Sequence, residues 1–545
     1  MKSKVLVLTI IGVIGFAAVA FAGVMGYRMF FGASHDEAVS LVPEDALVYG
    51  NVFLDPSIDQ KRAIGDLLEK FPQAPSADEA RNQLVDLFDK GLAEIDMSFD
   101  EDVDPWLGDQ IAGFAMTPND LIAAQPSDAA VLEQNAPVAA FLVASDDDEA
   151  ALAFIDEAAS RGDKGFTEKA YEGIDYKLSE SDGNAVGIVD GYVVVGSEPG
   201  LKAVVDTSGG EPNLSDNESY ADTIDRLTED RLATVYFDGR KLTEALEKSG
   251  AAPPGSDGAL GGLGALGVNA VEPVGAALFA QSDKVVFEAT STLPEGAAGD
   301  LARSAGSGLL AELPADSFGA LGLTDFGKTL TTFYEVAAQA FTGAGAGTAD
   351  DFDQQFEAQT GLNPREDLLA WMGDAGVFVT GTEPSTVAGG LVVQSTDPAT
   401  SSAAVGQIEQ LLQGQGLQTE PVSLAGANGF KVQPEGSPQP IVVLAGDKVV
   451  VAYGEQAAES AYSADPALSS SATFQSALGG LGDGFTPSGY FDLNAIQALA
   501  ESAGAAQFPE YEQEVKPWLD PLQYVAFGSS VDEDRVTQRL VIGIE

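Results

Sequence analysis

The chain has 545 residues, of which 45% are hydrophobic, so it is long enough to build two or more domains with packed cores. Its 84 acidic and 27 basic residues give a formal net charge of −57, which repels nucleic acid and anionic lipid head groups and suits cations, basic partners or a salty medium. With no cysteine and a single histidine, His35, near the N-terminus, the folded part has no disulfide, no thiol nucleophile and no histidine-based catalytic or metal site.

The N-terminal segment predicts a membrane anchor. Lys2 and Lys4 precede an uncharged run of 21 residues, 5–25, which as a helix spans roughly 30 Å, the thickness of the hydrocarbon layer. Ala20-Phe21-Ala22 also fits a cleavage signal, so removal of the segment is the alternative. We favour an uncleaved single pass through the cell membrane, with the N-terminus cytoplasmic and the bulk of the chain extracytoplasmic.

Beyond this segment, short strands alternate with helices. Ser57 and Gln60 have the spacing of a capping box at the start of a helix, and Asp190-Gly191 between two valine-rich runs predicts a hairpin. Trp106-Leu107-Gly108-Asp109 follows an acidic turn and leads into a strand. Strands are expected over residues 46–54, 111–116, 138–144, 174–176, 185–189, 192–196, 235–238, 274–280 and 284–291.

The same markers occur twice, in the same order. Pro43 returns as Pro314 after 271 residues, Trp106 returns as Trp371 after 265, and Tyr236-Phe237-Asp238 returns after 254. Offsets that shrink smoothly are typical of small deletions in loops, so we predict a tandem duplication. The paired residues of the motifs are Trp106, Gly108 and Asp109 with Trp371, Gly373 and Asp374, and Tyr236 and Asp238 with Tyr490 and Asp492.

The predicted organisation is therefore an anchor and tether over residues 1–38, one repeat unit over 39–298 and a second over 299–545. The expected fold class is α+β. Adjacent strands with hairpin turns predict a mostly antiparallel sheet in each unit, with helices packed on one face.

The N-terminal anchor, the Leu/Val-Pro-x-Asp opening, the Trp-Leu-Gly-Asp turn and the Tyr-Phe-Asp strand together resemble the bacterial DUF3352 family, a domain of unknown function. The resemblance covers most of residues 40–545. It implies a membrane-tethered extracytoplasmic protein of bacteria, and it brings no activity and no catalytic residues.

Three motifs raise chemical hypotheses. Asp100, Asp102 and Asp104 alternate as in a calcium loop, but Pro105 stands where the turn glycine belongs, and the pattern is not kept in the second unit. Residues 262–267 match a dinucleotide fingerprint without the preceding strand that it needs, so we interpret them as a loop. The recurring acids Asp109, Asp374, Asp238 and Asp492 offer paired carboxylates, but their places beside glycine or aromatic residues at strand edges favour turn hydrogen bonds.

Function hypotheses fall in three classes. The first is a non-catalytic binding or scaffold protein of the cell envelope that uses no cofactor and binds envelope proteins or a basic partner. The second is a carrier of a lipid or small apolar ligand held between sheet and helices. The third, which we favour least, is a carboxylate-dependent hydrolase.

Overall fold

The computed structural model describes residues 35–72, 85–86, 89–90, 92–116, 138–161, 165–180, 183–242, 272–293, 306–343, 349–532 and 534–545. The predicted anchor (5–25) and the glycine-rich segment 262–267 lie outside these ranges. Among the described helices, none combines the length and the apolar character needed to cross a membrane. The chain divides into two compact units, Met1–Thr292 and Leu293–Glu545.

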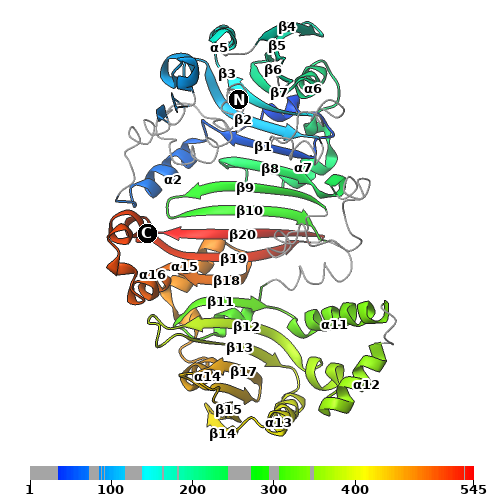
Figure 1. The fold of residues 1–545 in the computed structure, drawn as a ribbon, viewed down its shortest axis with the longest axis vertical. Coiled ribbons are helices and arrows are strands. Elements are labelled where there is room, and N and C mark those ends of the chain that lie inside the picture. Colours follow the sequence, from blue (N-terminus) through cyan, green and yellow to red (C-terminus); the bar gives the residue numbers. More distant parts are fainter. Residues whose placement is uncertain are drawn as a thin grey trace. The chain divides into compact units, whose positions relative to one another are not determined.

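Unit one is built on an antiparallel sheet (Figure 1). Its described strands lie side by side in the order β10-β9-β8-β1-β2-β3-β7-β6-β5-β4. Asp190 and Gly191 both have positive φ, 46° and 77°, and make the tight hairpin between β6 and β7 that their sequence predicts. The strands are β1 (Val48–Phe53), β2 (Leu107–Ala115), β3 (Ala139–Ser145), β4 (Phe166–Tyr171), β5 (Ile174–Ser179), β6 (Asn184–Val189), β7 (Tyr192–Ser197), β8 (Ala233–Asp238), β9 (Pro273–Gln281) and β10 (Lys284–Thr292).

Unit two repeats this arrangement strand for strand. Its described order is β20-β19-β18-β11-β12-β13-β17-β16-β15-β14, again antiparallel throughout. Adding ten to each strand number of unit one gives the order in unit two. The strands are β11 (Ser317–Leu323), β12 (Met372–Thr380), β13 (Ala388–Ser395), β14 (Thr419–Leu424), β15 (Ala427–Val432), β16 (Ile441–Ala445), β17 (Lys448–Tyr453), β18 (Thr486–Asp492), β19 (Leu522–Asp532) and β20 (Arg535–Ile544).

Several of the described helices begin at polar capping residues. The Ser57 side chain accepts a hydrogen bond from the Gln60 N–H at the start of α2, and Ser197 and Asp397 cap α6 and α13 in the same way. The helices of unit one are α2 (Ile58–Leu68), α5 (Asp148–Arg161), α6 (Glu198–Ser208) and α7 (Glu218–Ile224). Those of unit two are α11 (Phe326–Gly343), α12 (Ala349–Thr360), α13 (Pro398–Gly414), α14 (Glu455–Ser463), α15 (Ala472–Leu481), α16 (Leu493–Ser502) and α17 (Lys516–Leu519).

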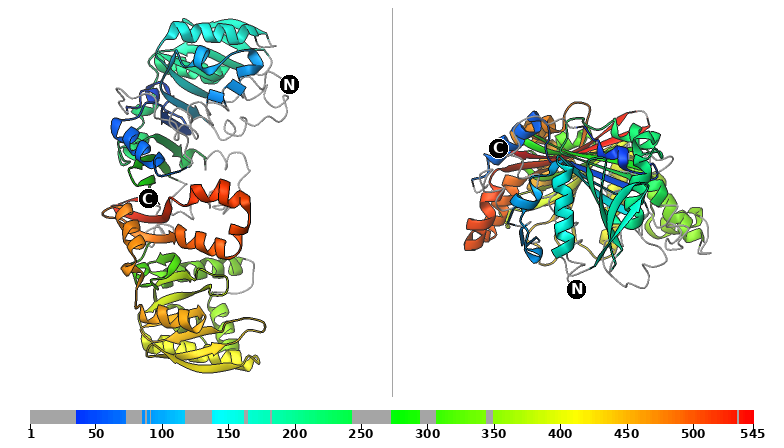
Figure 2. Two further views of the ribbon diagram at one scale, coloured as in Figure 1. Left: turned by 90° about the vertical axis from the view of Figure 1, so that its left-hand side faces the viewer. Right: turned by 90° about the horizontal axis from the view of Figure 1, so that it is seen from above.

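Helices cover both faces of the sheet, so the prediction of helices on one face is wrong. In β7, Val194 belongs to the core beneath α6, whereas its neighbours Val193 and Val195 belong to the core beneath α5. Successive side chains of a strand point to opposite faces, so a fully buried run such as β7 requires cover on both. The cyan helix in Figure 2 is α5, lying against the strands of unit one.

Each unit opens in the same way. In unit one the 3₁₀ turn η2 (Ala38–Leu41) leads to Pro43, which forms a β-bridge with Asn213. In unit two the turn η6 (Gly308–Glu312) leads to Pro314, which bridges to Ala467. The Leu-Pro and Val-Pro signals in the sequence therefore mark the place where the start of each unit is tied to a later 3₁₀ turn.

Glu198, the first residue of α6, ties this helix to the edge strands. Its side chain, 23% exposed, accepts hydrogen bonds from the Tyr176 hydroxyl (2.7 Å) and the Lys169 ammonium (3.2 Å), and forms an ion pair with Lys202 (3.0 Å). Burial alone would raise the pKa of Glu198, but these three donors outweigh it and lower the pKa to about 2.

We expect Glu198→Gln to lower the free energy of unfolding by about 1–2 kcal/mol at pH 7, because the charged acceptor is lost. A depressed folded-state pKa stabilises above the unfolded value of 4.5, and this contribution disappears as the pH falls from 4.5 toward 2. Denaturant unfolding at pH 7 and pH 3 measures the difference. Glu455→Gln, which removes the single Lys431 contact of the matching residue in unit two, should cost less. A deficit in Glu198→Gln as large at pH 3 as at pH 7 would contradict this assignment.

Candidate functional site

The Trp106 turn begins in a short π-helix, η4 (Phe99–Val103). The indole is 4% exposed, and its Nε1–H donates a 2.8 Å hydrogen bond to the backbone carbonyl of Asp102. The ring packs against Phe154 of α5, with 5.5 Å between the ring centroids. The tryptophan is thus a core residue whose one polar atom is satisfied within its own turn.

Trp371 is held in the same way. It follows the π-helix η7 (Pro364–Leu369), is 4% exposed, and donates from Nε1 to the carbonyl of Asp367 at 2.9 Å. The carboxylates of Asp102 and Asp367 each accept the backbone N–H four residues earlier, at 2.7 Å in both cases. In both units the recurring acid, Asp102 or Asp367, therefore binds the backbone N–H of the residue just before the π-helix.

The calcium hypothesis rested on Asp100, Asp102 and Asp104. One oxygen of Asp102 is used by the Ser98 N–H, and Asp100 is exposed. Across the described ranges, no group of three or more His, Asp or Glu side chains is placed to hold a metal ion.

Gly108 and Asp109 form an irregular step in β2. The pairing of β2 with β3 shifts between Leu107 and Ile111, and a Cβ at Gly108 would lie 2.7 Å from the backbone carbon of Ala144. The Asp109 carbonyl accepts N–H groups from both Leu54 (2.6 Å) and Asp55 (3.1 Å). The bulge thus needs a residue without a side chain, because β3 approaches too closely for any other.

The two aspartates after these glycines have different surroundings. Partial burial, followed by repulsion from Asp146 and Glu37, raises the pKa of the Asp109 carboxyl, although its side chain reaches solvent. The Asp374 carboxylate has both oxygens engaged: one accepts from the Ser307 hydroxyl at 2.6 Å, the other from the Asp325 N–H at 3.0 Å.

The tyrosines of the repeated Tyr-Phe-Asp strands lie in the cores. Tyr236 is 0% and Tyr490 1% exposed. Each meets an aromatic ring from a covering helix edge-on at 5.1 Å, Tyr220 of α7 in unit one and Phe474 of α15 in unit two. Burial raises the pKa of both phenols, so they stay protonated at neutral pH.

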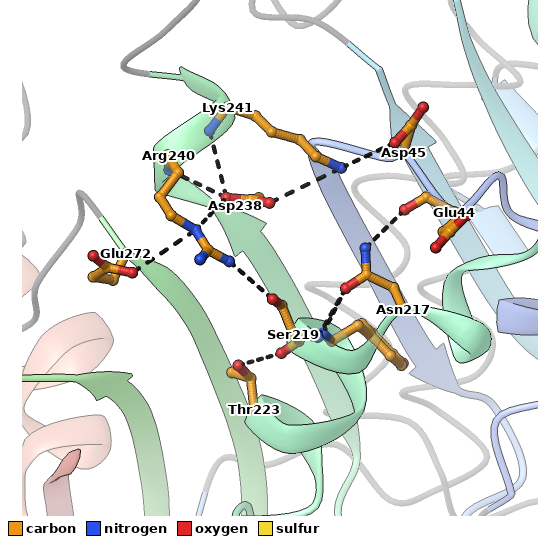
Figure 3. A network of polar contacts seen from close by, with 10 residues as sticks. Glu44, Asp45, Asn217, Ser219, Thr223, Asp238, Arg240, Lys241 and Glu272 are labelled. Carbon is orange, nitrogen blue, oxygen red and sulfur yellow. Dashed lines mark hydrogen bonds and ion pairs between the residues drawn. The ribbon is translucent and has the colours of Figure 1, made fainter. Parts of the chain in front are cut away.

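The aspartates that end these strands accept backbone N–H groups. Asp238 Oδ1 accepts from Arg240 (3.1 Å), and Asp492 Oδ1 accepts from Ala495 (3.0 Å) at the start of α16. Figure 3 shows Asp238 at the centre of a polar network in which Arg240 and Lys241 approach its carboxylate at 3.7 and 3.9 Å. Arg240 continues the network to the Ser219 hydroxyl at 2.8 Å.

In unit one, the two recurring acids Asp109 and Asp238 stand far apart. The Asp109 carbonyl accepts the N–H of Leu54, beyond one end of β1, and the Asp238 N–H donates to the carbonyl of Leu47, before the other end. Leu47 and Leu54 are seven residues apart along an extended strand, which separates Asp238 from Asp109 by about 20 Å. A pair of carboxylates acting on one bond is separated by about 5–9.5 Å, so unit one does not bring Asp109 and Asp238 into one cleft.

A row of exposed apolar side chains, which was not predicted from the sequence, crosses the sheet of unit two. Leu321 of β11 is paired with Val377 of β12, and these are 41% and 42% exposed. Leu391 of β13 comes next, half-buried, and then Val451 of β17, 37% exposed. Directly opposed residues of antiparallel strands share a face, so these four form one continuous strip, here called the apolar row.

The apolar row continues beyond β11 over a glycine. Leu321 is also paired with Gly489 of β18, which is paired with Phe527 of β19. The Phe527 ring lies directly against Gly489. Alternating apolar positions on these strands were the available signal, but only the strand register shows that they form one surface.

We predict that Gly108→Ala destabilises unit one by about 1–3 kcal/mol, because the new methyl group meets backbone atoms of β3 that cannot rotate away. Gly65→Ala is the matched control: nothing lies within 4 Å of its Cβ position in α2, so it should stabilise by about 0.5–1 kcal/mol. In Gly373→Ala the nearest atom is 3.2 Å away, and the loss should be smaller. The unfolding midpoints of the three variants test whether the loss of stability is largest for Gly108→Ala and smaller for Gly373→Ala. An unchanged midpoint in Gly108→Ala would refute the prediction.

Comparisons with known proteins identify a family for this chain. No curated protein matches the chain. Two crystal forms of TP0453 have similar regions: form III at 13% identity, over 48% of this chain and 82% of that one, and form I at 11% identity, over 47% and 79%. Their TM-scores, 0.24 and 0.25, are too low to carry an argument about fold or function. Residues 5–542 match the family described as "Protein of unknown function (DUF3352)", so the chain belongs to this family.

Proposed function

We propose that this protein is a non-catalytic binding protein of the bacterial cell envelope. In this proposal its N-terminal segment anchors it in the cell membrane, and both units lie outside the cytoplasm. The observation that carries the binding function is the apolar row of Leu321, Val377, Leu391 and Val451. Contiguous exposed apolar surface costs solvation free energy in a free protein and commonly marks a place where a partner binds.

The two units are best explained by tandem duplication. Identical strand order, the proline bridge at the start of each unit and the two indole–carbonyl hydrogen bonds all support a common ancestral unit. A duplicated unit offers two related surfaces that can diverge. The row position of Leu321 is taken by Gly50 in unit one, and that of Val377 by Gly113, so an extended apolar row of this kind is a feature of unit two.

The surroundings of the recurring acids support a non-catalytic function. Asp238, Asp374 and Asp492 each accept hydrogen bonds from backbone N–H groups, as capping and turn residues do. Asp109 reaches solvent but stands about 20 Å along the sheet from Asp238. The recurring acids Asp109 and Asp238 of unit one are therefore too far apart to act as an acid and base pair on one bond.

The strong negative charge of the chain disfavours acidic partners and favours basic ones. A second copy of the chain would bring another net charge of −57, so pairing of two copies through this face is opposed by long-range repulsion. A protein with an apolar centre and basic residues around it meets both the row and the acidic surface. We therefore propose an envelope protein of this character as the partner.

A carrier of an apolar ligand is the second candidate, and the same row is the observation that favours it. The described hollow in unit one, about 360 Å³ between α2 and the end of β9, does not suit such a ligand, because Asp59, Arg62, Asp66 and Asp230 are among the residues that line it.

Photo-crosslinking in intact envelopes tests the proposal. A photoreactive residue in place of Leu321 should give a discrete adduct with one protein, whereas the same residue in place of Phe508, which is 63% exposed and outside the row, should not. The double substitution Leu321→Asp with Val377→Asp should abolish that binding, and added salt should weaken it. If the folded protein gives no adduct at position 321, or the same adduct at position 508, the proposed binding surface is wrong. An adduct with lipid in place of protein would establish the carrier function instead.

A further inference from the structure

The first described residues of the chain are part of the core of unit one. Ala38 and Val42 are fully buried, and the Ala38 N–H donates to the Gln110 side chain at 3.4 Å. The Leu214 N–H donates to the Val42 carbonyl at 2.7 Å. The segment 36–42 is therefore docked on the sheet through η2, although its first three residues belong to the predicted tether.

Asp36 fastens the start of this segment. Its Oδ1 accepts the Tyr49 hydroxyl at 2.7 Å and the Val39 N–H at 3.3 Å, and Tyr49 is fully buried. The second oxygen, Oδ2, is buried and has no hydrogen-bond partner in the protein. Desolvation raises the pKa of Asp36, and the hydrogen bond from Tyr49 opposes this shift.

Next to Asp36, the sheet carries other buried polar atoms that also lack hydrogen-bond partners in the protein. Asn51 and Thr234 are directly opposed on β1 and β8, so their side chains share a face, and each is 1% exposed. The Asn51 side chain lies close enough to Asp36 to lower the pKa of its carboxyl, but neither amide atom of Asn51 nor the Thr234 hydroxyl makes a hydrogen bond of ordinary geometry. The Arg231 Nε, whose positive charge acts on Asp36, is also buried and unpartnered.

Five unpartnered polar atoms in one place are unusual, because nearly all buried polar groups in native proteins are hydrogen-bonded. Unit two differs at the equivalent strand positions that the structure describes. Ala320 and Gly322 take the places of Tyr49 and Asn51, because Ala320 is paired with Tyr490 as Tyr49 is with Tyr236. The polar cluster is therefore a feature of the unit that carries the N-terminal segment.

We propose that Asp36, Asn51, Thr234 and Arg231 form a buried hydration site that joins the N-terminal segment to the sheet. A buried water makes about three hydrogen bonds, so the five free atoms, Asp36 Oδ2, Asn51 Oδ1 and Nδ2, Thr234 Oγ1 and Arg231 Nε, call for about two waters. These waters complete the bonds that fix residues 36–42 on unit one. Residues 36–42 are thus held on unit one partly through bridging waters. In unit two, a direct hydrogen bond from Ser307 to Asp374 makes the corresponding connection.

The test compares substitutions of equal shape in the full chain. Thr234→Val removes an unpartnered hydroxyl, and Thr223→Val removes one that donates directly to the Ser219 carbonyl at 2.6 Å; both threonines are 1% exposed. If the cluster is hydrated, Thr234→Val should lower the melting temperature by roughly 2–4 °C. Magnetisation transfer from long-lived internal water to the Ala38 and Val39 amides should be present in the wild type, reduced in Thr234→Val and kept in Thr223→Val.

A dry cluster gives the opposite result. Replacing an unsatisfied hydroxyl by a methyl group would then leave the melting temperature unchanged or raise it, and no transfer from water to these amides would be seen in the wild type. That combination would overturn the proposal. Asn51→Leu repeats the comparison with the largest member of the cluster, and a rise in its melting temperature would count against buried water in the same way.

Discussion

The hydrogen bond from a buried indole to the carbonyl four residues earlier is the interaction on which each unit depends. An indole N–H removed from water without a partner costs free energy, and the π-helical turn before the tryptophan presents a carbonyl at the right place. The backbone carbonyl of the same tryptophan accepts an N–H from beyond the third strand, from Asp146 in unit one and Thr396 in unit two, at 2.8 Å in both. One residue thus fixes the turn, the strand that follows and its neighbour.

This constraint explains the glycine two residues later. Once the tryptophan is anchored on both sides, the chain must pass close to β3 before regular pairing resumes, and in unit one only glycine fits at 108. The strand then supplies apolar side chains to both faces. Helices cover much of this surface, and in unit two the apolar row is among the parts that stay exposed. The row thus arises from a sheet that is apolar on both sides, and it is the surface that we propose as a binding site.

The sequence predicted much of this framework. The nine expected strands, the Ser57 cap, the Asp190-Gly191 hairpin and the antiparallel sheet depend on local patterns and agree with the structure, but β4 (Phe166–Tyr171) was not predicted. Both repeated tryptophans are buried, in equivalent turns of the two units. The sequence did not predict helices on both faces of the sheet. A short apolar run such as Val193-Val194-Val195 does not show whether one face of the strand is covered or both.

The functional features were harder to predict, because they depend on register. Leu321, Val377 and Val451 are far apart in the sequence and become one surface only when strands pair. The same holds for Asn51 and Thr234, which meet across β1 and β8. Asp36 looked like part of a polar tether, and nothing local indicates that Tyr49 and Val39 hold it against the sheet.

Hydrogen exchange of the three tryptophan indole N–H groups, followed by NMR, tests the central claim most directly. The account predicts two indole protons that exchange slowly and at comparable rates, those of Trp106 and Trp371, and a third, of the 42%-exposed Trp518, that exchanges much faster. Each signal is assigned by its loss in a Trp→Phe variant. Fast exchange at Trp106 or Trp371, with the rest of that unit protected, would contradict the claim that these bonds anchor the two units.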